Sequence, residues 1–278
     1  MSDSFCFKFS KPKYSIVGES EEYFSMLDNG TLVTKRALDR EEKSSFSFIV
    51  KAVDGGKAGI GRNSATATVK LDLEDINDSV PMFTSPPDGF VTENQPPNTI
   101  VMSVTTIDRD SGPNADIEYF ITSSDSDNFD IGRLDGILRT KAVLDREKKE
   151  LFYVTITAMD MGKPRLSTSM EVKIHVVDTN DNTPMFNPKL YSTTVLENAT
   201  IGQNILQTTA FDDDEALNGA IRYTIVSGDK SRDFAIGEHS GVLRVNRKLD
   251  FERKNAYQLT IQAEDAGNPV KYDTASVR

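Results

Sequence analysis

The feature that most constrains this chain is a threefold internal repetition with a period of about 105 residues. Each copy carries a run in which apolar and polar residues alternate, and strict alternation is typical of a strand with one face on a core. The apolar positions of the three runs are Phe46, Phe48, Val50, Ala52; Phe152, Val154, Ile156, Ala158; and Tyr257, Leu259, Ile261, Ala263. Because three copies keep the same register, chance is a poor explanation.

Further signals support an all-β chain. Residues 69–73 and 172–176 alternate in the same way, and turn dipeptides precede short apolar strands at matching positions. These dipeptides are Asn29-Gly30, Asp135-Gly136 and Ser240-Gly241. No helical period of useful length is present. Short strands, regular turns and this period predict tandem Ig-like β-sandwiches with Greek-key connections in a linear array.

Acidic and carboxamide side chains gather where strands end. One stretch runs from Asp178 to Phe186, and a close copy runs from Asp75 to Phe83; in each a proline stops the strand. Calcium takes about six to eight oxygen ligands, which packed Asp and Asn side chains supply. Two unit charges about 4 Å apart repel by roughly 4 kcal/mol at an effective dielectric of 20. We therefore interpret these stretches as metal-binding linkers between repeats, which should splay without metal.

Composition excludes several classes of protein. The chain has 32 basic and 43 acidic residues, a net charge of −11, which argues against nucleic-acid binding. No run of about eighteen apolar residues exists, and Met1–Cys6 lacks the features of a signal peptide. The lone cysteine, Cys6, provides no disulfide framework and is interpreted as an inert thiol.

The repeat motifs resemble those of cadherin repeats over essentially the whole chain. They are Leu-Asp-Arg-Glu, Ala-x-Asp, Asp-x-Asn-Asp-Asn-x-Pro-x-Phe and Asp-x-Asp-x-x-x-Asn, in recurring order. The resemblance implies three calcium ions in each linker, which turn a flexible string of sandwiches into a stiff rod. It also implies calcium-dependent cell–cell adhesion at the extracellular face of the plasma membrane. The expected partner is another cadherin ectodomain, bound homophilically or heterophilically, and the parent's membrane anchor is expected outside this segment.

The resemblance assigns calcium ligands position by position. The second linker is expected to use Glu93, Asp145, Glu147, Asp178, Asn180, Asp181, Asp212, Asp214 and Asp265, with carbonyl groups of Thr179, Asn182 and Asn218. The first linker is expected to use Asp39, Glu41, Asp75, Asn77, Asp78, Asp108, Asp110 and Asp160, with carbonyl groups of Ile76, Ser79 and Asn114. Its basal Glu is missing, so weaker or partial occupancy is expected. Glu197, Asp250 and Glu252 match the lower half of a third linker.

Three domains are expected: residues 1–80 as a repeat without its opening strands, 81–183 as a complete repeat, and 184–278 as a repeat without its last strand and linker. The chain is therefore expected to be an internal fragment of a larger ectodomain. Because the chain contains no Trp, the anchor residue that classical cadherins exchange at their outermost repeat cannot be in this segment, which leaves the mode of adhesion open. Three glycosylation sequons begin at Asn29, Asn77 and Asn198; a metal role should block Asn77, and Asn29 is the best candidate.

Other functions are less consistent with the residues. An EF-hand loop fails because its Gly and Glu positions, counted from Asp178, hold Thr183 and Lys189. An enzyme is disfavoured because His175 and His239 belong to no catalytic constellation. The alternatives that stay open are a non-adhesive, calcium-stiffened spacer or force-bearing rod, and a glycan-binding module. A spacer should stay monomeric with calcium, and a lectin should bind sugar arrays.

Overall fold

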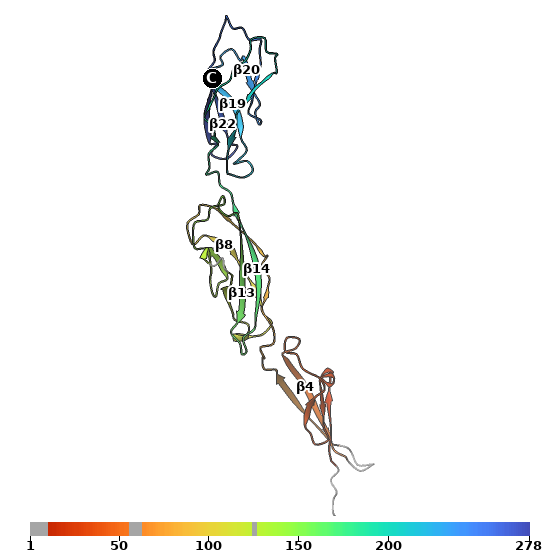
Figure 1. Cartoon of the computed structure of the whole chain (residues 1–278). Coiled ribbons are helices and arrows are strands. Elements are labelled where there is room, and N and C mark those ends of the chain that lie inside the picture. Colours follow the sequence, from red (N-terminus) through yellow and green to blue (C-terminus); the bar gives the residue numbers. More distant parts are fainter. Residues whose placement is uncertain (1–10, 56–62, 124–126) are drawn as a thin grey trace, which may run out of the picture. The chain divides into compact units, whose positions relative to one another are not determined.

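The computed structural model describes residues 11–55, 63–123 and 127–278, so Cys6 and the N-terminal residues lie outside the description. The described elements are β-strands and two short 3₁₀ helices, η1 (Glu19–Glu22) and η2 (Gly112–Asn114). Neither helix is long or apolar enough to cross a membrane. The chain is therefore all-β, as the alternating patterns predict (Figure 1).

Internal contacts divide the chain into two compact units. The first comprises Met1–Thr84, Thr106–Glu118 and Ala158–Thr168, and the second comprises the rest. The first unit contains a three-stranded antiparallel sheet of order β1-β4-β5 and the strand pairs β2-β3 and β6-β9. These strands are β1 (Lys13–Val17), β2 (Phe24–Met26), β3 (Leu32–Thr34), β4 (Ser45–Val53), β5 (Ser64–Asp72), β6 (Met82–Phe83) and β9 (Thr106–Ile107).

The core of the first unit is aromatic. Phe24 lies at 5.0 Å, ring centroid to ring centroid, from Phe46 and at 5.2 Å from Phe48. Ile16 completes the buried cluster, while Val69 and Leu71 of β5 are only partly buried against it. The register pairs Phe48 with Val69, so the apolar faces of β4 and β5 point the same way. The alternation at 46–52 and 69–73 therefore marks the core-facing side, as predicted.

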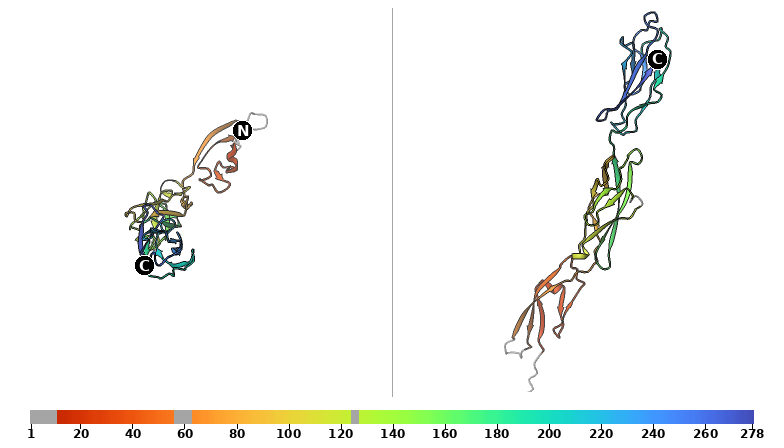
Figure 2. Two further views of the ribbon diagram at one scale, coloured as in Figure 1. Left: turned by 90° about the horizontal axis from the view of Figure 1, so that it is seen from above. Right: turned by 90° about the vertical axis from the view of Figure 1, so that its left-hand side faces the viewer.

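The remaining described strands form four sheets and one strand pair (Figures 1 and 2). The sheets have the orders β10-β13-β14-β7, β11-β12-β8, β16-β23-β22-β19 and β17-β21-β20, and the pair is β15-β18. Their bounds are β7 (Asp88–Thr92), β8 (Ile100–Ser103), β10 (Ile117–Ile121), β11 (Phe129–Ile131), β12 (Ile137–Thr140), β13 (Leu151–Asp160), β14 (Ser167–Val177), β15 (Met185–Phe186), β16 (Leu190–Tyr191), β17 (Asn204–Gln207), β18 (Ala210–Phe211), β19 (Arg222–Ser227), β20 (Phe234–Ile236), β21 (Val242–Val245), β22 (Leu259–Glu264) and β23 (Tyr272–Val277).

Two sheets enclose each core, which makes a sandwich. In the C-terminal part, Leu243 and Val245 of β21 share one buried cluster with Ile261 of β22 and Ala275 of β23. The equivalent residues of β13 and β14, such as Ile156 and Ile174, are fully buried. The strand β22 begins at Leu259, so Tyr257 precedes it and is only partly buried, with its hydroxyl donating to Asp233 at 2.9 Å. The predicted alternation is otherwise confirmed.

The structure also places the predicted turn glycines, the two histidines and the three sequon asparagines. Gly30, Gly136 and Gly241 lie in turns with positive φ (+85°, +64° and +65°), which glycine adopts without steric cost. His239 is exposed, and half-buried His175 stacks on Phe90 with 5.0 Å between centroids. Among the sequons, Asn77 is buried at 8% exposure, whereas Asn29 and Asn198 are exposed.

Candidate metal centre

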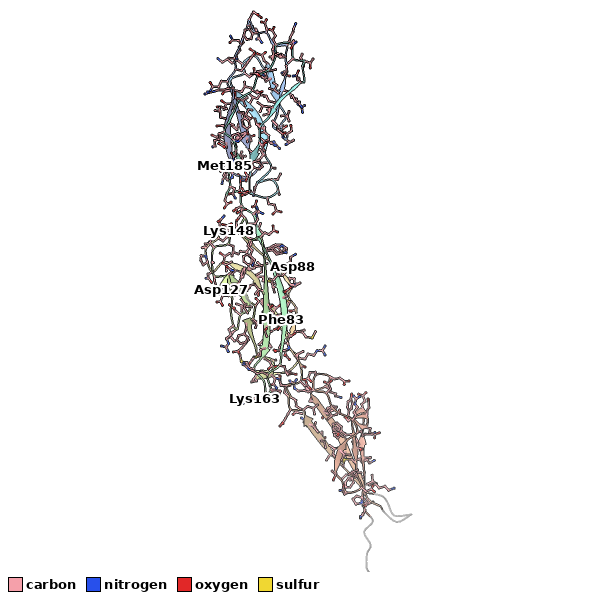
Figure 3. All side chains as sticks on the ribbon, in the orientation of Figure 1. Phe83, Asp88, Asp127, Lys148, Lys163 and Met185 are labelled. Atoms are coloured by element: carbon pink, nitrogen blue, oxygen red, sulfur yellow. The ribbon has the colours of Figure 1, made fainter. Side chains whose placement is uncertain are left out.

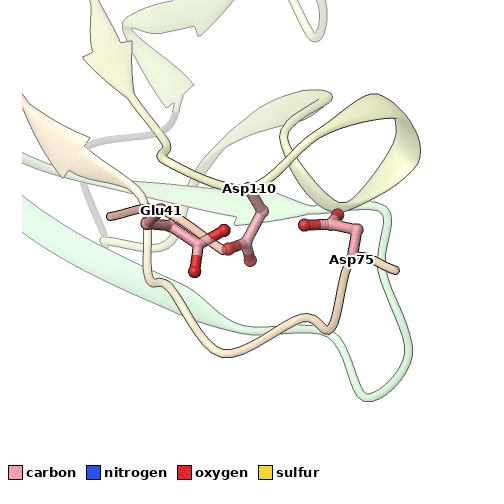
Figure 4. A group of neighbouring side chains, drawn as sticks. All are labelled: Glu41, Asp75 and Asp110. Atoms are coloured by element: carbon pink, nitrogen blue, oxygen red, sulfur yellow. The ribbon is translucent and has the colours of Figure 1, made fainter. Parts of the chain in front are cut away.

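A first acidic group, defined by Glu41, Asp75 and Asp110, forms within the first unit. One carboxylate oxygen from each residue lies within 4.8 Å of the others (Figure 4). Glu41 ends the Leu-Asp-Arg-Glu turn, Asp75 follows β5, and Asp110 precedes η2. Three loops far apart in the sequence thus converge their carboxylates on one place, as the repeat motifs predict.

Two of these carboxylates, Asp75 and Asp110, accept hydrogen bonds from backbone N–H groups and from the Asn114 side chain. The N–H of Ser79 donates to Asp110 Oδ2 at 3.1 Å, and the N–H of Ser111 donates to Asp75 Oδ2 at 3.0 Å. Asn114 Nδ2 also donates to Asp75 Oδ2, at 2.9 Å. Because each bond joins residues more than thirty positions apart, the loops are fixed to one another and not merely adjacent.

A second acidic group, defined by Glu93, Glu147, Asp178, Asp181 and Asp214, lies within the second unit. It contains two overlapping sets, Glu93–Glu147–Asp181 and Glu147–Asp178–Asp214, in each of which ligand oxygens lie within 4.8 Å of one another. Glu147 belongs to both sets, which is the geometry expected of a carboxylate that bridges two cations. The predicted second-linker residues are therefore gathered more completely than those of the first.

Glu93 is fully buried at the base of this group. Its Oε1 accepts the N–H of Thr179 at 2.8 Å, and its Oε2 accepts the N–H of Arg146 at 2.8 Å. A buried carboxylate is costly unless it is paired or hydrogen-bonded. These bonds connect Glu93 to the Leu-Asp-Arg-Glu turn and to the segment that follows β14. Glu93 therefore holds the group together even without a metal.

The two linker asparagines adopt the same arrangement. Asn77 Nδ2 donates to Asp160 Oδ2 at 3.1 Å and to the carbonyl of Pro164. Asn180 Nδ2 donates to Asp265 Oδ2 at 3.1 Å and to the carbonyl of Pro269 at 2.7 Å. In both residues the amide nitrogen thus has two acceptors, while the carboxamide oxygen is buried without a donor.

Several buried oxygens at predicted ligand positions, in or beside the two acidic groups, have no hydrogen-bond donor. Such oxygens show whether the residues present suit a metal ion. They are Asp75 Oδ1, Asn77 Oδ1, Asp108 Oδ2, Asp110 Oδ1, Asn180 Oδ1 and Asp212 Oδ2. Asp75 Oδ1 has an ion pair with Arg40 at 3.2 Å, without hydrogen-bond geometry. Because buried polar atoms are almost always satisfied, unpartnered oxygens at predicted ligands fit a hard, oxygen-seeking cation.

Burial, with added repulsion between neighbouring carboxylates, raises several pKa values in and beside these groups. Burial raises the pKa of Asp108, and the charges of Asp110 and Asp160 add to this rise against hydrogen bonds that oppose it. Burial likewise raises the pKa of Glu147, with added repulsion from Glu93 and Asp181.

Burial and neighbouring carboxylates also raise pKa values in the loop after β18 and in the segment after β5. Burial and the Asp265 charge raise the pKa of Asp212. Burial and the charges of Glu41 and Asp110 raise the pKa of Asp78. Such carboxylates favour a bound positive charge. Asp178 differs: burial raises its pKa, but hydrogen bonds from Glu215, Asn218 and Arg146 outweigh burial and lower it.

Other predicted ligands have protein partners instead. Asp145 pairs with the exposed Lys148 at 2.7 Å, and Asp39 accepts the N–H of Glu42. Asp160 and Asp265 hold Asn77 and Asn180. Their predicted ligand roles, and those of the carbonyl groups of Ile76, Ser79, Asn114, Thr179, Asn182 and Asn218, stay predictions.

The residues expected to form half of a third linker, Glu197, Asp250 and Glu252, lie less close together than those of the two acidic groups. Glu197 Oε2 accepts the N–H of Phe251 at 3.0 Å, which ties it to the Leu-Asp-Phe-Glu turn. Within the ranges that the structure describes, Glu197, Asp250 and Glu252 do not form a group with ligand oxygens within 4.8 Å. Their role as half of a further linker stays a prediction.

Two functional positions were missed by the sequence analysis. A Cβ on Gly162 would lie 2.4 Å from Asn77 Cγ, and a Cβ on Gly267 would lie 2.2 Å from Asn180 Nδ2. Only glycine allows this approach of the loop to the linker asparagine. The signal was present, because Asp160 and Asp265 are both followed by x-Gly-x-Pro.

Comparison with known proteins agrees with this geometry. Three segments match the family described as Cadherin domain, at residues 8–74, 87–177 and 191–278. The chain belongs to the cadherin family. Its repeats are of the non-enzymatic kind that this family contains, so the expectation that it is not an enzyme is confirmed.

Individual relatives place the chain within a diverse family. It is 39% identical to human "Protocadherin Fat 4" over 269 residues, which covers 96% of this chain and 5% of the relative. It is 37% identical to mouse "Cadherin EGF LAG seven-pass G-type receptor 2" over 259 residues, 90% of this chain and 9% of the relative. Among solved structures, "Protocadherin gammaB7 EC3-6 cis-dimer structure" matches with a TM-score of 0.83 and 27% identity, covering 96% of this chain and 66% of that one.

Proposed function

We propose that this chain is a calcium-dependent segment of a cell–cell adhesion ectodomain, displayed at the extracellular face of a plasma membrane. The observation that carries the proposal is the set of buried oxygens without a hydrogen-bond donor on Asn77, Asp108, Asp110, Asn180 and Asp212. Calcium bound there would supply the positive charge that these oxygens lack and would join loops of consecutive repeats, stiffening the linkers. We take the repeats as residues 1–80, 81–183 and 184–278.

The residue set favours calcium over smaller cations. Carboxylates and carboxamides in the second acidic group offer many oxygens at varied orientations, which suits the large, irregular coordination shell of calcium. Magnesium demands a compact octahedron and keeps much of its water. Glu93, Glu147, Asp181 and Asp214 are proposed as side-chain ligands in the second linker, and Glu41, Asp75, Asp78 and Asp110 in the first, with the other predicted positions completing each shell.

The partner is proposed to be another cadherin ectodomain, either a second copy of this chain or a relative. The support is family membership together with a structural neighbour that was solved as a cis-dimer. A non-adhesive, calcium-stiffened spacer is the alternative, and self-association in calcium separates the two.

The metal proposal is tested by thermal unfolding followed by far-UV circular dichroism, because the chain has no Trp. Millimolar calcium should raise the unfolding midpoint well above the midpoint in EDTA, and magnesium should raise it much less. An Asp145→Ala, Glu147→Ala variant should lose most of the calcium gain. The matched control is Asp130→Ala, Glu171→Ala, which removes two exposed carboxylates outside the acidic groups.

A wild-type midpoint that is the same in calcium and EDTA would contradict the metal site. Adhesion is tested separately, by aggregation of beads coated with the chain in calcium and in EDTA. Aggregation in calcium alone supports an adhesive segment. Beads that stay dispersed in both, while calcium still raises the unfolding midpoint, would leave the spacer as the function.

A further inference from the structure

An arginine lies inside the second acidic group, where the proposed function places cations. Arg146 Nε donates to Asp178 Oδ1 at 2.7 Å, and its Nη2 lies 2.8 Å from Glu147 Oε1. The same Nη2 donates to the carbonyl oxygen of Asp213 at 2.7 Å. The side chain is only 10% exposed, so these contacts are largely withdrawn from water.

The three contacts of Arg146 reach three separate segments. Glu147 belongs to the Leu-Asp-Arg-Glu turn, Asp178 follows β14, and Asp213 lies in the loop between β18 and β19. The planar guanidinium carries five N–H donors and stays protonated, so it can bind several oxygens at fixed angles. One side chain therefore bridges the same three segments that a metal in this group would bridge.

The first acidic group contains the equivalent arginine. Arg40 Nη1 donates to Glu41 Oε1 at 2.8 Å and forms an ion pair with Asp75 Oδ1 at 3.2 Å. Two copies of the motif thus place a guanidinium on the equivalent pair of carboxylates. The third copy differs, because Phe251 stands at that position and is 59% exposed.

We propose that Arg146 is a built-in counter-ion that bridges the second acidic group when calcium is absent and lowers the affinity of the group for calcium. This inference rests on the proposed function for its second half. In the metal-free chain the guanidinium offsets carboxylate repulsion and holds the Asp212–Gly219 loop. When calcium binds, it competes with a positive charge already present on Glu147 and Asp178.

The test is an Arg146→Leu variant with two readouts that should move in opposite directions. In EDTA, hydrogen exchange at the amides of Asp214, Glu215 and Asn218 should become faster by about tenfold, because the loop loses charge-assisted bonds. In calcium titrations followed by calorimetry, the affinity of the variant should rise by about fivefold, because a nearby positive charge is gone. A residue with a merely structural role would lower calcium affinity as it loosened the loop.

Two controls isolate the role of Arg146. Arg222→Leu removes the same charge from an exposed site that pairs only loosely with Glu238, at 3.7 Å, and should leave both readouts near wild type. Arg146→Lys keeps the charge but not the planar fork, so it should keep calcium affinity close to wild type. Exchange in β22 and far-UV circular dichroism report whether each variant is folded.

The failures of the two proposals are distinguishable. A wild-type chain that takes up no calcium overturns the proposed function. The inference on Arg146 is overturned if Arg146→Leu exchanges like wild type in EDTA, or if it binds calcium more weakly than wild type. It is also overturned if Arg146→Lys binds calcium as tightly as Arg146→Leu, since charge would then not be the cause.

Discussion

The carboxamides of Asn77 and Asn180 have the arrangement that the proposed calcium sites require. Each amide nitrogen donates to an aspartate and to a proline carbonyl, and these two bonds fix the orientation of the carboxamide oxygen. Both oxygens are buried and lack a donor. Burying an unpartnered oxygen costs free energy in the metal-free protein, and a bound cation in the proposed sites would offset that cost.

Gly267 permits this arrangement in the second group, which leads to a prediction. Gly267→Ala should displace Asn180, because the new Cβ would lie 2.2 Å from its Nδ2 and 2.8 Å from Asn218 Oδ1. We expect the calcium-induced rise in the unfolding midpoint to fall by about half, with a cost in EDTA of only about 1 kcal/mol. Far-UV circular dichroism melts with and without calcium measure both quantities.

Asn180→Ala serves as the companion variant, since it removes the oxygen without adding a clash. It should reproduce the loss of calcium response. If Gly267→Ala responds to calcium as wild type does, the Asn180 oxygen is not a ligand and the fit argued for this position is wrong.

At the scale of elements, the two-residue strand β15 connects the second linker to the following core. Phe186 is 2% exposed, and its ring centroid lies 6.0 Å from that of Tyr223. Its neighbour Met185, labelled in Figure 3, is 59% exposed. In the strand pair β15-β18, Met185 lies opposite Phe211. Because side chains alternate along a strand, one of two adjacent apolar residues anchors the linker and the other faces water.

This difference predicts unequal effects of truncation. Phe186→Ala should lower the free energy of unfolding by about 3–4 kcal/mol, as expected for emptying a buried aromatic site. Met185→Ala should change it by less than about 0.5 kcal/mol. Urea unfolding in EDTA, followed by far-UV circular dichroism, makes the comparison without a contribution from metal. Equal effects of the two variants would mean that β15 does not seal the core as described.

At the scale of the whole molecule, charge is the dominant property. The chain carries a net charge of −11, and among the described residues eight of its 43 acidic side chains belong to sets whose ligand oxygens lie within 4.8 Å of one another. Repulsion that Arg40 and Arg146 leave uncompensated in these groups opposes folding, and a metal ion or salt would reduce it. The stability of the metal-free chain should therefore depend on ionic strength more than that of an ordinary β-sandwich.

This dependence is a prediction for the intact chain. Raising sodium chloride from about 0.01 M to about 1 M shortens the screening length from about 30 Å to about 3 Å. In EDTA the unfolding midpoint should rise by several degrees, whereas the increment from added calcium should shrink. Differential scanning calorimetry at several salt concentrations measures both trends. A midpoint in EDTA that falls as salt rises would show that carboxylate repulsion is not the limiting term.

Much of the fold was predictable because its signals are local. The alternation at 152–158 predicted β13, and the Asn29-Gly30 dipeptide predicted the turn between β2 and β3. The candidate site was predictable in part, since the resemblance to cadherin repeats singled out Glu41, Asp75 and Asp110, and the structure brings their carboxylates together. The start of β22 was less predictable, because Tyr257 continues the alternation yet uses its hydroxyl to bind Asp233.

The sequence by itself determined the strands, the turns and which acidic residues belong together, because period-two alternation and internal repetition act along the chain. Only the tertiary structure decided which oxygens are free, because that depends on donors from distant loops, such as Arg146 on Asp178 and Asn77 on Asp160. It also decided that Gly162 and Gly267 must lack a side chain. These are contacts between segments, and no local pattern encodes their geometry.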